Sequence, residues 1–186
     1  MDGLTLLAAV ASTAISAGPP DRSAWIVEGF IGPSITPLFA SYDRRLTGGV
    51  GLYYARPEKR FRLAHMNGEL IVGAYYANSH SNGVDNDPPV TTHAFGALAF
   101  GRWKFAADER SYVYADVGWG LQMASRSTTE LDSTLNSTPF VGLGVGIDAR
   151  GSEVLLGARF IHLSNGNTTG RNIGQNQLWF TLGFKF

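Results

Sequence analysis

A histidine and a serine stand two residues apart late in the chain, in the stretch 160–167, FIHLSNGN. A serine hydroxyl becomes a nucleophile when an imidazole takes its proton, and a third polar group holds that imidazole in the correct tautomer. His162, Ser164 and the later Asn176 could supply these three parts of a hydrolytic triad. The pattern His-x-Ser is short, so polar residues that merely end a strand are the alternative. The surrounding elements must decide between the two.

Alternation of apolar with small or polar residues recurs along the chain, and a period of two is that of a β-strand. Residues 111–122 and 140–150 each place aliphatic or aromatic side chains on one face and glycine, tyrosine or aspartate on the other. A transmembrane barrel turns such an apolar face to lipid and fills its narrow interior with small and polar groups. A soluble β-sandwich would instead cover the apolar face with a second sheet, and this fold remains the alternative.

The alternation predicts eight strands, most of them reaching the roughly 9–11 residues that a tilted strand needs to cross a bilayer. They are 23–32, 46–56, 61–76, 90–104, 110–122, 139–150, 153–164 and 176–186. Their connections alternate between short turns and long polar loops, the long ones being 32–45, 78–89, 125–138 and 165–175. That alternation is typical of outer-membrane barrels, whose short turns are periplasmic. We therefore predict an all-β fold, an eight-stranded antiparallel transmembrane β-barrel of the outer-membrane type, as a single domain over residues 21–186.

Both ends of the chain carry targeting features. Residues 4–17 form an apolar, small-residue run, so residues 1–20 are predicted to be a signal peptide or an unstructured N-terminus. Asp2 and the lack of Lys or Arg before this run depart from a usual signal, and a buried helix is the alternative. The last strand, LWFTLGFKF, alternates apolar residues and ends in Phe186, which resembles the signal that barrel-assembly machinery recognises.

Composition excludes several classes of function. The chain of 186 residues has no net charge and no basic block, so nucleic acid is not an expected partner. It has no cysteine, which excludes disulfides, thiolate metal sites and a cysteine nucleophile. Charged residues make up 16% of the chain, against about 25% in an average soluble domain. No residue pattern calls for a metal or an organic cofactor.

The phase of the last two strands places the candidate triad on the apolar face. Period two carries the row that contains Leu156 and Phe160 on to His162 and Ser164, at the strand end beside a long loop. The apolar row of the last strand extends backwards to Asn176. Polar groups on a lipid-facing surface are costly and are usually functional. The three side chains are therefore expected to meet on the outer surface, at the external rim.

The longer stretch FIHLSNGNTTGRNIGQN resembles the PagL-type outer-membrane lipid A 3-O-deacylases, also known as acyloxyacyl hydrolases. The family hallmark is His-x-Ser-Asn, then Asn-x-Gly in a short loop, then an acidic residue at the start of the last strand. The resemblance is specific over about 20 residues and extends loosely over the barrel. It implies a Gram-negative outer-membrane enzyme that removes an ester-linked acyl chain from the lipid A of lipopolysaccharide, on its lipid-facing surface and without a cofactor.

The resemblance also implies a role for each matching residue. Ser164 would be the nucleophile and His162 the general base, while Asn176 would orient the histidine. The residues expected to bind the developing oxyanion or to shape the substrate loop are Asn165, Gly166, Asn167, Asn172 and Gly174. The departure lies at Asn176, where the best-known members carry Glu. An amide oxygen can accept the His N–H but brings no full negative charge, so reduced activity or a shifted pH optimum is expected.

Two other functions stay open. The barrel could be a non-catalytic structural or binding protein, which Asn176 favours. It could also be a phospholipase or lipase on the same fold, because the substrate groove is not readable from the sequence. A homodimer likewise stays open.

The remaining aromatic and charged residues carry plainer expectations. Membrane-interface belt residues are expected among Tyr53, Tyr54, Tyr75, Tyr76, Trp103, Trp119 and Trp179. Arg159, Asp116 and Asp148 have the phase of interior residues and are expected to form ion pairs inside the barrel.

Overall fold

A computed structural model describes residues 23–35, 43–58, 67–83, 88–105, 108 and 110–186. The predicted signal peptide, residues 1–20, lies outside the described residues, and so do the first residues of the third predicted strand. No helix in the described part of the chain is long and apolar enough to span a membrane.

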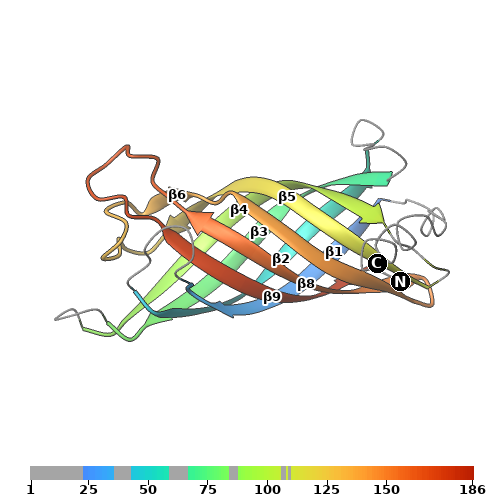
Figure 1. Ribbon diagram of the computed structural model, residues 1–186, viewed down its shortest axis with the longest axis horizontal. Coiled ribbons are helices and arrows are strands. Elements are labelled where there is room, and N and C mark those ends of the chain that lie inside the picture. The colour runs from blue at the N-terminus through green and yellow to red at the C-terminus, as the bar shows by residue number, and fades with distance from the viewer. Residues whose placement is uncertain (1–22, 36–42, 59–66, 84–87, 106–107, 109) are drawn as a thin grey trace, which may run out of the picture.

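The described residues form nine β-strands (Figure 1). They are β1 (Ala24–Pro33), β2 (Arg45–Pro57), β3 (Asn67–Ser81), β4 (Val90–Phe105), β5 (Ser111–Ala124), β6 (Leu135–Ser137), β7 (Phe140–Ala149), β8 (Ser152–Leu163) and β9 (Gln175–Lys185). Eight of them match the predicted strands in number and order. The short strand β6 lies in the segment that was predicted to be a loop.

Antiparallel pairing closes the sheet into a barrel. Neighbours in sequence pair with each other from β1 to β5 and from β7 to β9, and β1 pairs with β9. The pairing of β5 with β7 completes the ring. A closed ring leaves no strand edge unpaired. The predicted eight-stranded antiparallel barrel is confirmed. The alternative, a soluble β-sandwich, is excluded because the strands form one closed sheet.

Strand β6 extends the line of β7 beyond a break at Thr138 and Pro139. Ser137 pairs with Ser164 on the neighbouring strand, and Phe140 pairs with Ile161. The register is therefore the same before and after the break. The His162 amide donates to the Pro139 carbonyl at 3.0 Å, which keeps the ladder continuous. The stretch LNSTP has no apolar alternation, so periodicity alone assigned it to a loop. The extension matters because it supports the end of β8, where His162 and Ser164 lie.

The two ends of the barrel differ. The loops that join β5 to β6 and β8 to β9 lie together at one end, which we call the loop end (Figure 1). The β7–β8 turn and the C-terminus lie at the opposite end, the turn end (Figure 1). The loop-end segment 165–174 directly follows β8, so the last residues of β8 belong to the rim.

The outer wall is a continuous apolar band. Each of the eight long strands contributes at least one exposed large apolar side chain. Those more than half exposed include Phe95, Val117, Trp119, Leu143 and Phe180. Their neighbours in sequence point inwards, as the period of two requires. Water would meet this whole surface in a soluble protein, and patches of this extent mark a membrane or partner surface.

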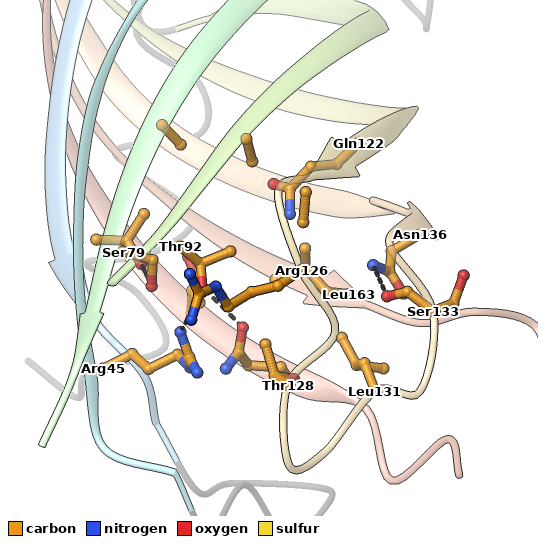
Figure 2. A pocket seen from close by; sticks show the side chains of 16 residues that line it. Arg45, Ser79, Thr92, Gln122, Arg126, Thr128, Leu131, Ser133, Asn136 and Leu163 are labelled. Atoms are coloured by element: carbon orange, nitrogen blue, oxygen red, sulfur yellow. Dashed lines mark hydrogen bonds between the residues drawn. The ribbon is translucent and has the colours of Figure 1, made fainter. Parts of the chain in front are cut away.

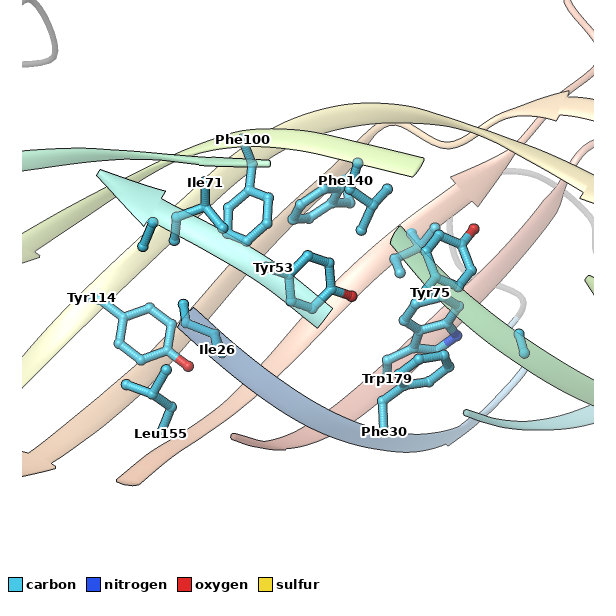
Figure 3. Packing of buried hydrophobic residues seen from close by; sticks show 14 of the residues in the cluster. Ile26, Phe30, Tyr53, Ile71, Tyr75, Phe100, Tyr114, Phe140, Leu155 and Trp179 are labelled. Atoms are coloured by element: carbon cyan, nitrogen blue, oxygen red, sulfur yellow. The ribbon is translucent and has the colours of Figure 1, made fainter. Parts of the chain in front are cut away.

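Aromatic rings, and not only small groups, fill the middle of the barrel (Figure 3). Tyr53, Tyr75 and Trp179 are buried at 0%, 3% and 1% exposure, so their expected place in an interface belt is wrong. Phe30 stacks on Trp179 with ring centroids 3.9 Å apart. The inward glycines provide the space, since a Cβ on Gly73 would overlap the Tyr53 side chain. Glycine on the inner face therefore indicates a large neighbour rather than an empty interior.

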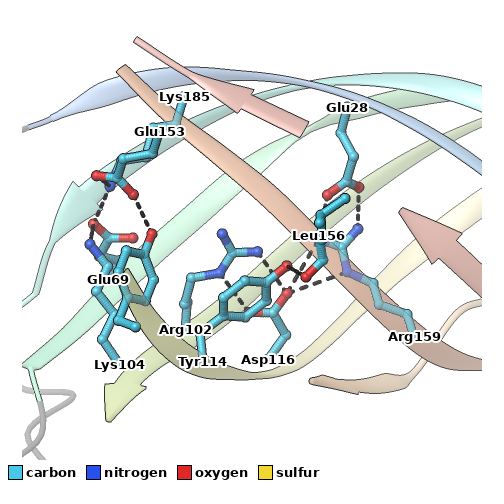
Figure 4. A network of polar contacts seen from close by, with 11 residues as sticks. Glu28, Glu69, Arg102, Lys104, Tyr114, Asp116, Glu153, Leu156, Arg159 and Lys185 are labelled. Atoms are coloured by element: carbon cyan, nitrogen blue, oxygen red, sulfur yellow. Dashed lines mark hydrogen bonds and ion pairs between the residues drawn. The ribbon is translucent and has the colours of Figure 1, made fainter. Parts of the chain in front are cut away.

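Two groups of buried ion pairs lie inside the barrel (Figure 4). Arg159 pairs with Glu28 and, at 3.3 Å, with Asp116, which holds Arg102 at 2.8 Å. A second group joins Glu69 to Lys104 at 3.0 Å and to Lys185 at 2.6 Å. These pairs neutralise one another, as buried charges must. The interior place expected for Arg159 and Asp116 is found. Asp148, by contrast, is exposed at the β7–β8 turn, where it accepts the Gly151 amide.

Candidate active site

His162 and Ser164 lie at the loop end of β8 on the outer side of the wall. They are partly exposed, whereas the intervening Leu163 is 1% exposed and points into the barrel. The outward row below them continues through Phe160 to Leu156. His162 and Ser164 therefore face outwards, as predicted. They lie at the loop end of the outer apolar band.

Asn176 meets His162 from the neighbouring strand. The two residues pair directly across β8 and β9, and His162 Nδ1 lies 2.7 Å from Asn176 Oδ1. Asn176 is 1% exposed, so this hydrogen bond is shielded from water. Because an amide oxygen only accepts, the histidine must donate from Nδ1. Nε2 then carries the lone pair, which is the tautomer a general base needs.

Gly174 makes room for the imidazole. Its φ of +83° lies in the left-handed region that favours glycine, and a Cβ there would stand 2.6 Å from His162 Cε1. Any side chain at this position would both strain the loop and push the ring away from Asn176. The glycine of the Asn-x-Gly motif is therefore required because the His162 ring occupies the space of a side chain at position 174.

Asn172 places its amide beside the serine hydroxyl. Its Nδ2 lies 3.0 Å from Ser164 Oγ, and its Oδ1 accepts the Asn165 backbone N–H at 3.0 Å. That second bond fixes which end of the amide is oxygen, because a backbone N–H needs an acceptor. Asn172 Nδ2 also donates to Asn167 Oδ1 at 3.0 Å, so the side chain is held from both ends.

The backbone after Ser164 turns back over its side chain. The Gly166 N–H donates to Ser164 Oγ at 3.1 Å. Gly166 and Asn167 both have positive φ values, of 65° and 58°. The turn thus brings an amide N–H to the serine oxygen, beside the place where an oxyanion would form on a bound ester.

Two expected oxyanion donors have other partners. The Asn165 side-chain Nδ2 donates to the carbonyls of Thr169 and Arg171 at 2.8 and 3.1 Å, and its Oδ1 accepts the Asn167 N–H at 2.9 Å. Asn165 is 5% exposed and forms the centre of its own loop. Its amide and the Asn167 N–H therefore hold the loop in this structure, which leaves Gly166 N–H and Asn172 Nδ2 as the donors at the hydroxyl.

The family model described as lipid A 3-O-deacylase (PagL) matches residues 47–185. The chain belongs to this deacylase family. The match includes all the site residues described above, from His162 to Asn176.

Solved structures agree on the fold. The crystal structure of the outer membrane enzyme PagL is 20% identical, covers 87% of this chain and 98% of its own, and superposes with a TM-score of 0.59. Neisserial surface protein A is 13% identical over 88% of this chain and 95% of its own, with a TM-score of 0.55. No curated protein matches the chain in sequence. At these identities the likeness concerns the barrel, while the family assignment rests on the sequence match.

A neighbouring loop, which sequence reasoning missed, supports the site of this PagL-family chain. Leu131 forms a β-bridge with Asn172, and Glu130 accepts the Ile173 N–H on its carbonyl at 3.0 Å. The Glu130 side chain is fully buried and accepts from Asp43 N at 3.0 Å and Gln175 Nε2 at 3.1 Å. An acidic residue inside a polar loop gives no periodic signal, so only the folded loops reveal it.

Metal ligands do not gather at the site. In the described part of the chain, no three His, Asp or Glu side chains come together in a group that could hold a metal ion. The groups at hand here are a hydroxyl, an imidazole and amides, which are those of acyl transfer.

Proposed function

We propose that this chain is an outer-membrane esterase that removes an ester-linked acyl chain from lipid A, with Ser164 and His162 acting on the lipid-facing surface. The observation that carries the proposal is the shielded His162–Asn176 hydrogen bond of 2.7 Å on the outward row that ends at Ser164. A serine with two donors at its hydroxyl and a histidine oriented by Asn176 thus stand two residues apart at the loop end of an otherwise apolar wall. Membership of the deacylase family supports the substrate class.

The proposed reaction runs through an acyl-enzyme. Ser164 Oγ attacks the ester carbonyl carbon while His162 Nε2 takes the hydroxyl proton. The oxyanion forms on the former carbonyl oxygen, next to Oγ, and we expect the Gly166 N–H and Asn172 Nδ2 to donate to it; both groups lie beside Oγ, at 3.1 and 3.0 Å. The intermediate collapses, and the sugar alcohol leaves with the proton from His162. A water molecule then attacks the acyl-enzyme carbonyl while His162 takes its proton. The second tetrahedral intermediate releases the fatty acid, and Ser164 Oγ leaves with the proton from His162.

The substrate would reach the site sideways from the membrane. The outward row below His162 is apolar, with Phe160, Leu178 and Phe180 on β8 and β9. An acyl chain could lie along these side chains while its ester group stays at the polar rim. An active site inside the barrel would not meet a lipid, which explains why these residues face outwards.

Location and partners follow from the same proposal. The protein would sit in the outer membrane of a Gram-negative bacterium with its loop end outwards, and its partner would be lipopolysaccharide in the outer leaflet. The apolar last strand with Phe186 would engage the barrel-assembly machinery during insertion. A homodimer stays open in this arrangement.

Loss of the nucleophile or the base should abolish the activity. Ser164→Ala and His162→Ala are expected to leave lipid A fully acylated, whereas the wild-type protein removes one acyl chain per lipid A. Mass spectrometry of lipid A after expression measures this directly. Heat-modifiable gel mobility is the control that tests whether both variants still form barrels. Unchanged lipid A with the wild-type protein would refute the deacylase proposal.

A non-catalytic surface barrel is the second candidate, because Asn176 lacks the charge that an acidic residue would bring. A phospholipase on the same fold would use the same residues. Profiling glycerophospholipids alongside lipid A separates the three functions, since each predicts a different set of shortened lipids.

A further inference from the structure

A polar cavity lies inside the loop end of the barrel, behind the wall that carries the candidate active site (Figure 2). Leu163, Gln175 and Gln177 form part of its lining, and their neighbours in sequence are His162, Ser164 and Asn176. The remaining lining comes from β2 to β6 and the β5–β6 loop. The cavity is separate from the site because the two occupy opposite faces of the same strands.

The lining is cationic. Arg45 and Arg126 both border the cavity, and no described residue of the lining is acidic. Figure 2 shows the two guanidinium groups pointing toward one another. Hydroxyl and amide side chains complete the polar lining; they are Thr47, Ser79, Thr92, Gln122, Thr128, Ser133, Asn136, Gln175 and Gln177.

Arg45 presents an unused donor in this cavity. Its side chain is 1% exposed, and its Nε pairs with Asp43, which is not among the lining residues, at 2.6 Å. One terminal nitrogen reaches Thr92 Oγ1 at 3.3 Å, whereas the other is buried without a hydrogen-bond partner. The Thr128 hydroxyl is likewise buried without a partner. A buried guanidinium N–H without an acceptor is costly, so the arrangement calls for a bound acceptor.

We propose that this cavity binds a small inorganic anion of the size of chloride between Arg45 and Arg126. Its free volume is about 20 Å³, and roughly 10–15 Å³ of such volume holds one water molecule. A phosphate or a lipid headgroup would not fit in that space. Arg126 is exposed and forms the solvent side of the site, while Arg45 forms its buried base.

The anion would stabilise the folded loop end. It would separate two like charges and satisfy the unused Arg45 donor, thereby holding the β5–β6 loop, which carries Arg126, against the inner wall. A ligand that binds only the folded state raises its stability in a concentration-dependent, saturable way. This proposal does not depend on the deacylase activity.

The test compares chloride with gluconate at constant ionic strength, using the full chain folded in detergent micelles. The temperature at which gel mobility changes from folded to unfolded is expected to rise with chloride and then to saturate. Arg126→Gln should lose most of that chloride-dependent rise. Arg44→Gln is the matched control, because Arg44 is an exposed neighbour of Arg45 that does not line the cavity. It should keep the full response.

A crystal soaked in bromide gives an independent reading. Anomalous signal is expected between Arg45 and Arg126 in the wild-type protein and should be absent in Arg126→Gln. The proposal is wrong if the cavity shows only water, if chloride and gluconate give the same unfolding temperature, or if Arg126→Gln responds like Arg44→Gln. Phosphate that stabilises the protein as strongly as chloride would overturn the size assignment.

Discussion

At the residue scale, Asn176 is the side chain expected to set how well His162 acts as the base of the proposed reaction. Its oxygen holds His162 in the tautomer that leaves Nε2 free, at 2.7 Å and away from water. The hydrogen bond therefore supplies orientation. It does not supply the negative charge that would stabilise the imidazolium formed when Ser164 is deprotonated.

A carboxylate at this position should accelerate the enzyme. Asn176→Asp keeps the shape of the side chain, and Asn176→Glu restores the residue expected for the family. A hydrogen bond between charged groups is worth about 1 kcal/mol more than a neutral one, so kcat is expected to rise about tenfold or less. Release of fatty acid from purified lipid A measures the rate.

Asn176→Leu is the matched opposite variant, since it removes the acceptor and should lower kcat with little change in KM. Higher deacylase activity in Asn176→Glu would distinguish a weak enzyme from a barrel that lacks a substrate site. If Asn176→Glu and Asn176→Leu behave alike, Asn176 has no orienting role.

At the scale of elements, two loops and a strand extension build the site jointly. Strand β6 pairs with the end of β8 through Ser137 and Ser164. The β5–β6 loop then joins the β8–β9 loop, with the Asp132 N–H donating to the Arg171 carbonyl at 3.0 Å and the Arg171 N–H donating to Asp132 Oδ2 at 2.8 Å. The β8–β9 loop therefore rests on the β5–β6 loop.

The β8–β9 loop should tolerate no side chain at Gly174. Gly174→Ala is expected to lower kcat at least tenfold, because the added Cβ would stand 2.6 Å from His162 Cε1 and a displaced base transfers protons poorly. Steady-state kinetics on folded protein in detergent checks this.

Gly151→Ala is the matched control. Gly151 has a φ of +95°, but a Cβ there would meet no atom within 4 Å. It carries the same kind of backbone strain at the turn end, far from the site, so its kcat should stay at the wild-type value. Equal losses in both variants would mean that backbone strain, and not the contact with His162, limits position 174.

At the scale of the whole molecule, the buried ion pairs join strands on different sides of the barrel and are expected to stabilise it. Asp116 pairs with both Arg102 and Arg159 in the buried interior. Removing one partner from a buried ion network leaves a charge without compensation, which commonly costs about 3–5 kcal/mol.

Asp116→Asn should therefore destabilise the barrel by about 3–5 kcal/mol, because Arg102 would lose the carboxylate of Asp116, while Arg159 would keep Glu28. Urea unfolding in detergent, followed by tryptophan fluorescence, measures the change in the free energy of unfolding. Asp148→Asn removes the same charge at an exposed turn and should change that free energy by about 0.5 kcal/mol or less. Similar losses in the two variants would show that the network is not a unit.

The sequence by itself determined the eight long strands, the face each one turns outwards, and the pairing of His162 with Asn176 on that side of β8 and β9. All of these follow from a period of two, which is a property of the local backbone and is visible in any stretch of residues. Phase counting along two neighbouring strands was enough to place three polar side chains on one outer surface.

Only the tertiary structure decided how the site is completed. Asn165 was expected to bind the oxyanion, yet its amide is used by Thr169 and Arg171, while Asn172 holds the serine. Tyr53 was expected at the membrane interface and lies in the interior. Such contacts join residues that are distant in sequence or lie in loops without a period. Their partners are therefore chosen by how the closed barrel brings the loops and inner faces together.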